Sequence, residues 1–192
     1  MTPLLAGLAL LAQMATNTQY GYRFPLPAGF ADFPEATATN ADIVQCWSET
    51  TPVSASGALI LCVQRMHGTI GREGLRPQDV PAGSQLVHYK WKGFDIDGIR
   101  TDTAESGNPI VILAAQLPLR GEAVNLILTG PRDQVARVEG IMSATLAGFE
   151  GETNWLTAEQ RAGRLGNIVG VAIGLLLVLT VARILRARRR AA

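Results

Sequence analysis

The chain has 192 residues and a formal net charge of +1, from 17 Lys and Arg against 16 Asp and Glu. All 16 acidic residues and 12 basic ones precede Leu165, giving about −4 there, and the other 5 basic residues follow it. An acidic folded part argues against a nucleic-acid partner. The roughly 130 residues left once both ends are set aside suit one domain with a sizeable core.

The first residues, 1–15, read MTPLLAGLALLAQMA, with an apolar stretch from Leu4 to Ala12 and a small residue at Ala15. This pattern is typical of a secretory signal peptide that is cleaved after a small residue. An uncleaved anchor is the alternative, although so few apolar residues are too short to span a bilayer. Both interpretations predict export.

A hairpin with a cross-strand disulfide is expected next. An alternating aromatic strand at 20–24 and a proline-rich connector precede two apolar strands, at 43–49 and 58–63. A turn centred near residue 54 would place Cys46 opposite Cys62, the only other cysteine. Directly opposed residues come close enough for a disulfide, which persists in an exported domain. Two buried free thiols are the alternative.

The middle of the chain predicts a surface loop at 66–83 followed by four more strands. The strand at 85–91 could turn at Lys92-Gly93 or at Asp97-Gly98. We prefer the first turn, which leads into the strand at 94–103 with a bulge at Gly98. The runs IVILAAQL and AVNLILT that follow are almost continuously apolar. Such strands are usually central in a sheet and buried on both faces.

One amphipathic helix is predicted at about 132–147. Val135, Val138, Ile141, Met142 and Leu146 recur at helical spacing, so they should face the sheet. Gly148 suits the helix end. A second helix is expected to begin within 154–164, where Thr157 and Gln160 are spaced as a capping box.

This order of elements resembles the PsbP-like and DcrB-like superfamily. The resemblance covers about 20–149 and depends on Tyr22-Arg23-Phe24-Pro25, on Trp91-Lys92-Gly93 and on the closing segment 126–149. It implies an α+β fold, with an antiparallel sheet of about six strands between helices in an α/β/α sandwich. It also implies a scaffold or assembly factor that is not an enzyme and needs no cofactor.

Residues 165–185, LGNIVGVAIGLLLVLTVARIL, predict a transmembrane helix. The arginines at its end and in the tail 186–192 mark the cytoplasmic side; they are Arg183, Arg186, Arg188, Arg189 and Arg190. The domain at 20–149 and the linker at 150–164 would then lie outside the cytoplasm of a bacterial inner membrane. Gly166, Gly170 and Gly174 line one face of the span, as in helices that pair closely, which predicts a homodimer.

Polar residues with catalytic potential are sparse. His67 and His88 are the only histidines, and their spacing offers no metal clip. Asp95, Asp97, Asp102 and Glu105 begin like a calcium loop, but Ile99 stands where the third ligand belongs and Ser106 where the closing glutamate belongs. The sequence therefore predicts neither a catalytic site nor a metal site.

Tyr89, Trp91 and Phe94 gather at one hairpin beside Lys90 and Lys92. An exposed aromatic tip would make them a partner-binding surface, and packing in the core is the more frequent alternative for such residues.

Three functions follow from these patterns. The leading hypothesis is a single-pass membrane protein whose exported domain binds or assembles another envelope protein. The span and arginine tail also resemble a carboxyl-terminal sorting signal removed by a membrane protease, although residues 155–166 lack the motif expected there. The third hypothesis is an envelope hydrolase with an unrecognised site.

Overall fold

The computed structural model describes residues 13–53 and 57–156 of the chain. Most of the signal-like segment, the predicted span with Gly166, Gly170 and Gly174, the five arginines of the carboxyl end and the helix start at Thr157 therefore lie outside the described residues. Within the described residues, no helix is long and apolar enough to cross a bilayer.

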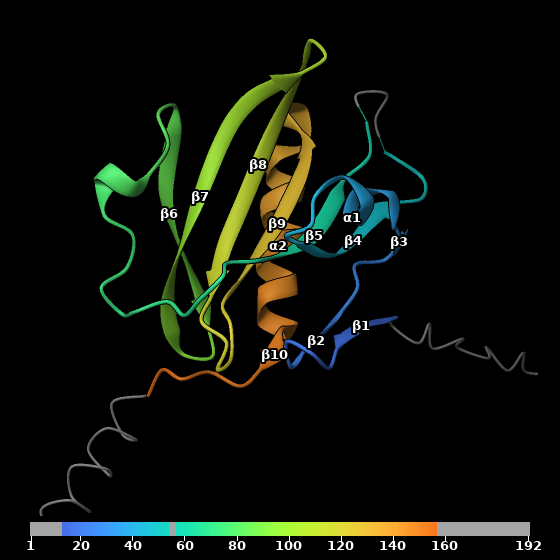
Figure 1. Ribbon diagram of the computed structural model, residues 1–192. Coiled ribbons are helices and arrows are strands. Elements are labelled where there is room, and N and C mark those ends of the chain that lie inside the picture. Colours follow the sequence, from blue (N-terminus) through green and yellow to red (C-terminus); the bar gives the residue numbers. More distant parts are fainter. Residues whose placement is uncertain (1–12, 54–56, 157–192) are drawn as a thin grey trace, which may run out of the picture. The chain divides into compact units, whose positions relative to one another are not determined.

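The main sheet has seven antiparallel strands, one more than the sequence predicts, in the order β3-β4-β5-β9-β8-β7-β6 (Figure 1). Their bounds in that order are β3 (Phe30–Asp32), β4 (Ile43–Glu49), β5 (Ile60–Arg65), β9 (Val124–Pro131), β8 (Asn108–Leu117), β7 (Phe94–Glu105) and β6 (Ser84–Trp91). The two most apolar runs, β8 and β9, are central as expected.

A second sheet of three strands, β1-β2-β10, lies beside the first. It consists of β1 (Met14–Asn17), β2 (Tyr22–Pro25) and β10 (Glu150–Gly151). Ala15 pairs with Phe24 and is only 4% exposed. The folded domain therefore begins before residue 20, and cleavage after Ala15 would remove half of β1.

The proline-rich connector is more structured than the sequence predicts. It contains β3 and the short helix α1 (Glu35–Thr39), and Phe33 donates its N–H to the carbonyl of Cys46 at 2.8 Å. The prolines disfavour a long strand but leave room for these short elements. The expected loop at 66–83 is confirmed, with one 3₁₀ turn, η1 (Pro77–Asp79).

The β6–β7 hairpin turns at Lys92-Gly93 as predicted, with φ of 50° and 78° at those residues. The bulge expected at Gly98 is wrong, because the pairing runs unbroken from Trp91 with Phe94 to Ser84 with Thr101. Gly98 is needed for close packing instead: a Cβ there would lie 2.4 Å from the carbonyl oxygen of Ala114 and 2.6 Å from the ring of Tyr89.

One face of the main sheet, here called the helix face, packs against α2 (Val135–Gly148). The turn η2 (Arg132–Gln134) leads into this helix, close to the predicted start. Val138, Met142 and Leu146 of α2 are buried in one core cluster with Leu113 and Leu128 of the sheet. The periodic apolar residues determine which side of α2 faces the sheet, because burying this apolar stripe contributes most of the free energy that stabilises the helix.

The opposite face, here called the open face, carries no such helix among the described residues. Figure 1 shows this face toward the viewer, with α2 behind the strands and with α1 and the 66–83 segment in front of the margins. The expected α/β/α sandwich is thus corrected to an α+β fold with one long helix in the described part of the chain. Strands that the sequence predicts to be buried on both faces are fully buried on one and half-buried on the other.

Candidate functional site

The aromatic hairpin is not an exposed surface. Trp91 is 1% exposed and Phe94 8%, both in the core cluster, and Tyr89 is half-buried against it. Trp91 donates its indole N–H to the carbonyl of Phe149 at 2.8 Å. Packing on the helix face therefore decides their position, and of the two possibilities that the sequence leaves open, the exposed aromatic tip is wrong for Trp91 and Phe94. Burial also raises the pKa of Tyr89 to about 12.

The open face presents a continuous apolar strip instead. Strand register aligns one residue from each of five strands across it, and each of these side chains is half-buried. The row is Cys62, Ile127, Ala114, Ile99 and Leu86. A neighbouring row adds Ile60 and Ile112, which both flank Thr129, and Ile110 lies beyond them. Such a strip on a solvent-facing sheet is typical of an interaction surface.

The disulfide expected between Cys46 and Cys62 is formed. Its two residues are directly opposed in β4 and β5, and Cys62 belongs to the apolar row. The bridge therefore links β4 to β5 within the main sheet, at one end of the apolar row.

A polar pocket of about 320 Å³ lies at the lower margin of the open face, between the 70–75 segment, β6, β7 and Trp155. Asp97 holds this segment in place: one carboxylate oxygen accepts the N–H of Leu75 at 2.6 Å, and the other lies 2.9 Å from Nδ1 of His88. Arg72 lies over the rings of Phe94 and Trp155, 5.1 and 5.5 Å from their centres. These contacts anchor the loop against the sheet.

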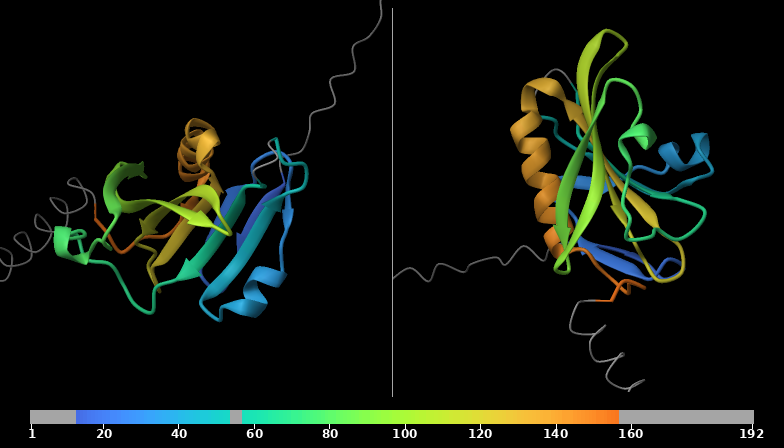
Figure 2. Two further views of the ribbon diagram at one scale, coloured as in Figure 1. Left: turned by 90° about the horizontal axis from the view of Figure 1, so that it is seen from above. Right: turned by 90° about the vertical axis from the view of Figure 1, so that its left-hand side faces the viewer.

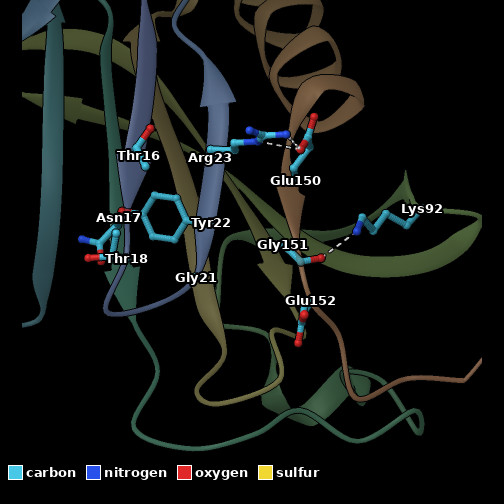
Figure 3. Close-up of a pocket in the computed structure, with 10 residues that line it drawn as sticks. All are labelled: Thr16, Asn17, Thr18, Gly21, Tyr22, Arg23, Lys92, Glu150, Gly151 and Glu152. Carbon is cyan, nitrogen blue, oxygen red and sulfur yellow. Dashed lines mark hydrogen bonds and ion pairs between the residues drawn. The ribbon is translucent and has the colours of Figure 1, made fainter.

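A second pocket, of about 410 Å³, opens between β1, β2, β10 and the Lys92 turn (Figure 3). Arg23 and Lys92, its two basic residues, already have partners within the domain. Arg23 reaches Glu150 at 2.7 Å and Lys92 donates to the carbonyl of Gly151 at 2.7 Å, as the dashed lines in Figure 3 show. A wider hollow of about 680 Å³ next to it is bordered by Arg120 and Glu152, an exposed ion pair at 2.9 Å.

The two histidines lie apart, each beside a different aspartate. Nε2 of His67 is 2.7 Å from Oδ1 of Asp42, which also accepts a bond from Arg65. These hydrogen bonds, first that of His67 and then that of Arg65, lower the pKa of Asp42. Among the described residues, no group of three or more His, Cys, Asp or Glu side chains is arranged to hold a metal ion.

The acid cluster of the sequence is divided by the alternation of β7. Asp95 pairs with Lys90 and Asp97 with His88 on the open face. Asp102 points to the helix face, where it binds Arg100 at 3.3 Å and Arg132 at 3.4 Å. The structure thus gives Asp95, Asp97 and Asp102 each a partner within the domain.

Comparison with known proteins shows a likeness of fold. No family model matches the chain, and no curated protein matches it in sequence. Among solved structures, a Bacteroides thetaiotaomicron VPI-5482 protein is similar with a TM-score of 0.52 and 12% identity over 74% of this chain; the match spans 49% of that protein. Cyanobacterial PsbP (CyanoP) from Synechocystis sp. PCC 6803 is similar with a TM-score of 0.50 and 13% identity, over 76% of this chain and 95% of CyanoP.

A third structure, LpqN involved in cell envelope biogenesis of Mycobacterium tuberculosis, has a TM-score of 0.46 and 11% identity, over 74% of this chain and 86% of LpqN. At these identities the likeness concerns the fold alone. The likeness to CyanoP supports the resemblance of fold that the sequence pattern suggests.

Proposed function

We propose that this chain is a single-pass membrane protein whose folded domain lies outside the cytoplasm and acts as a non-catalytic binding or assembly module for another envelope component. The apolar strip of the open face carries this proposal. Its isoleucines contribute little to the core, yet they form a contiguous apolar surface. Burying such a surface on a partner is favourable by about 25 cal/mol per Å².

The chemistry of the pockets also favours binding over catalysis. Arg23, Lys92 and Arg120 are each engaged with a carboxylate or a carbonyl group of the domain itself. His88 and Asp97 serve to hold the 70–75 segment. A general acid or base needs a group directed at a substrate, and these groups are directed at one another.

The proposed location depends on the sequence of the two ends and on the disulfide. Residues 165–185 are apolar and five arginines follow within or after them, which by the positive-inside rule puts the tail in the cytoplasm. The Cys46–Cys62 bridge would be maintained in an oxidising compartment outside it. We also propose that the transmembrane helices of two copies of the chain pair through Gly166, Gly170 and Gly174, which would form a homodimer.

Topology is tested in spheroplasts with epitopes on the domain and after Ala192. We expect added protease to digest the domain and spare the tail, and a thiol reagent to label the cysteines only after reduction. A protected domain with freely reactive thiols would place it in the cytoplasm and overturn the proposal. The intact mass of the mature protein would show at once whether the span has been removed as a sorting signal.

Binding is tested by mild chemical cross-linking of intact cells and purification of the full chain in detergent. We expect a second envelope protein at a constant ratio to the chain. The control is a chain that keeps residues 157–192 but lacks the domain, which should lose that protein. Equal recovery with both chains would assign the binding to the carboxyl end, and recovery of the chain alone would contradict a binding role.

A further inference from the structure

We infer that two copies of this chain pair edge to edge through β6, so that their main sheets join into one continuous antiparallel sheet; this inference rests on the proposed function for the anchoring of both copies in one membrane. The main sheet ends in two very different edges. At one edge β3 has three residues, whereas at the other edge β6 has eight. A long edge strand presents a row of unpaired backbone groups with which another strand can pair.

The turn after Trp91 determines which backbone groups of β6 point outward. In a hairpin with a two-residue turn, the residues on either side of the turn exchange hydrogen bonds, and every second pair along the ladder does the same. Here the first such pair is Trp91 with Phe94. The residues whose backbone groups point away from β7 are therefore the intervening ones, Leu86, His88 and Lys90. Among the described residues, none of these outward N–H and C=O groups has a hydrogen-bond partner.

The neighbouring segments leave this edge accessible. In the right-hand view of Figure 2, which looks onto the edge, α2 lies on one side of β6 and the 66–83 segment on the other. Within the described residues, the backbone of β6 contacts that segment through one hydrogen bond, from the N–H of Ser84 to the carbonyl of Pro81 at 3.0 Å. The stretch 85–91 is therefore free to pair with a second strand.

Two-fold symmetry restricts the register of the pairing. Opposed residues of an antiparallel pair share a face of the sheet, so when β6 pairs with its own copy the axis passes through a residue. An axis at Val87 opposes the two valines, sets Leu86 against His88 and allows up to about six backbone hydrogen bonds. An axis at His88 would oppose two histidines, and like charges directly opposite are destabilising. The axis therefore lies at Val87.

The end of the described chain favours a second copy as the occupant of this edge. The ring of Trp155 meets that of Phe94 edge-on, with centres 5.8 Å apart, so the chain leaves the domain beside the β6–β7 turn. Residues 157–164 then separate the domain from the proposed span, a tether of up to about 26 Å. With the axis at Val87, the two turns lie about 27 Å apart. Each tether can cover half of that distance, so paired spans hold the two edges at a high effective concentration.

The test places single cysteines in the full chain, whose only two cysteines are bridged. Val87→Cys puts a thiol at the axis, in a non-hydrogen-bonded pair whose Cα atoms lie about 4.5 Å apart, close enough for a disulfide. Gln85→Cys is the matched control, because this residue is exposed on the same face of β6 but lies about 14 Å from its counterpart. After mild oxidation of membranes, non-reducing gels should show about tenfold more covalent dimer for Val87→Cys than for Gln85→Cys.

Proline substitutions separate strand pairing from folding. Leu86→Pro removes an N–H that points away from β7, and proline is tolerated at such positions of an edge strand. It should lower the dimer yield of Val87→Cys about tenfold, because the central hydrogen bonds between the copies are lost. Lys90→Pro makes the same change near the end of the pairing and should lower the yield less. An intact Cys46–Cys62 bridge and an unchanged unfolding temperature show that a variant folds, and if Leu86→Pro fails this check, Lys90→Pro decides.

A cysteine at Gly170 reports the proposed pairing of the spans separately. A dimer through Gly170→Cys but not through Val87→Cys would overturn the strand pairing and leave the proposed function standing. A dimer through Val87→Cys alone would support the strand pairing and remove the paired spans from the proposed function. Equal yields for Val87→Cys and Gln85→Cys, a yield that neither proline lowers, or an adduct of Val87→Cys with a different protein would overturn the inference.

Discussion

The two faces of the seven-stranded sheet are built from the same strands but differ in what covers them. Along β9, Val124, Leu126 and Leu128 on the helix face are 0% exposed, whereas Ile127 on the open face is half-buried. β8 repeats the pattern with Leu113 and Ile112. Apolar side chains thus occur on both faces, and only α2 and the aromatic cluster beneath it make one of them the core. The proposed binding role uses this difference, since the open face is apolar although its isoleucines lie outside the core cluster.

The largest expected effect is the difference in stability between alanine variants of the neighbouring residues Leu128 and Ile127. Leu128→Ala should lower the free energy of unfolding by about 2–5 kcal/mol, because it leaves a cavity under α2. Ile127→Ala should cost about 1 kcal/mol, since its side chain is already in contact with water. Urea unfolding of the full chain in mild detergent measures both. Equal losses would show that the open face is packed as tightly as the helix face.

The disulfide is the next largest contribution and belongs to the open face. Cys46 and Cys62 are separated by 16 residues, and closing a loop of this size stabilises a fold by about 3 kcal/mol. Replacing both by Ala should lower the urea midpoint accordingly. Adding a reductant to the native protein should give the same shift, and it should have no effect on the double variant. A double variant as stable as the native protein would show that the bridge does not constrain the unfolded chain.

The sequence predicts the local elements of this fold well. It predicts poorly which faces of these elements are covered by other parts of the chain. The opposition of Cys46 and Cys62, the Lys92-Gly93 turn and the face of α2 follow from spacing within one or two neighbouring elements. The place of β1 and the burial of Trp91 depend on contacts across the chain, such as the bond from Trp91 to the carbonyl of Phe149. An apolar run does not reveal which of its two faces will be covered.

The apolar strip of the open face could not be predicted from the sequence for the same reason. Ile112 and Ile127 stand in runs that are apolar at nearly every position, which favours burial on both sides. The available signal was the presence of only one amphipathic helix within the domain, too few to cover both faces of a wide sheet. The disagreement between these two patterns points to the candidate site.

Alanine substitutions at two glycines should change the stability of the domain by smaller amounts and in opposite directions. Gly98→Ala would place a Cβ 2.4 Å from the carbonyl oxygen of Ala114, and the strain should destabilise the domain by about 1–3 kcal/mol. Gly140→Ala, in α2 where an added Cβ would meet open space, should stabilise it by up to about 1 kcal/mol. Thermal unfolding of both variants measures the contrast. A neutral Gly98→Ala would mean that β7 and β8 can separate locally without cost.

The smallest expected effect concerns the rim of the helix face, where Arg137 of α2 binds Glu49 of β4 at 2.5 Å. The Glu49 side chain is only 4% exposed, and the hydrogen bond from Arg137 lowers its pKa. Since the folded state holds this carboxylate ionised below its unfolded pKa of about 4.3, the pair stabilises the fold above that pH and loses this contribution as the pH falls through the folded pKa. Glu49→Gln should cost about 1–2 kcal/mol at pH 7, and its difference from the native protein should shrink as the pH falls below about 4.

Glu150→Gln removes the exposed partner of Arg23 and should change stability little at either pH. A pH-independent cost of Glu49→Gln would mean that shape rather than charge joins α2 to β4, and that the helix face depends on packing alone.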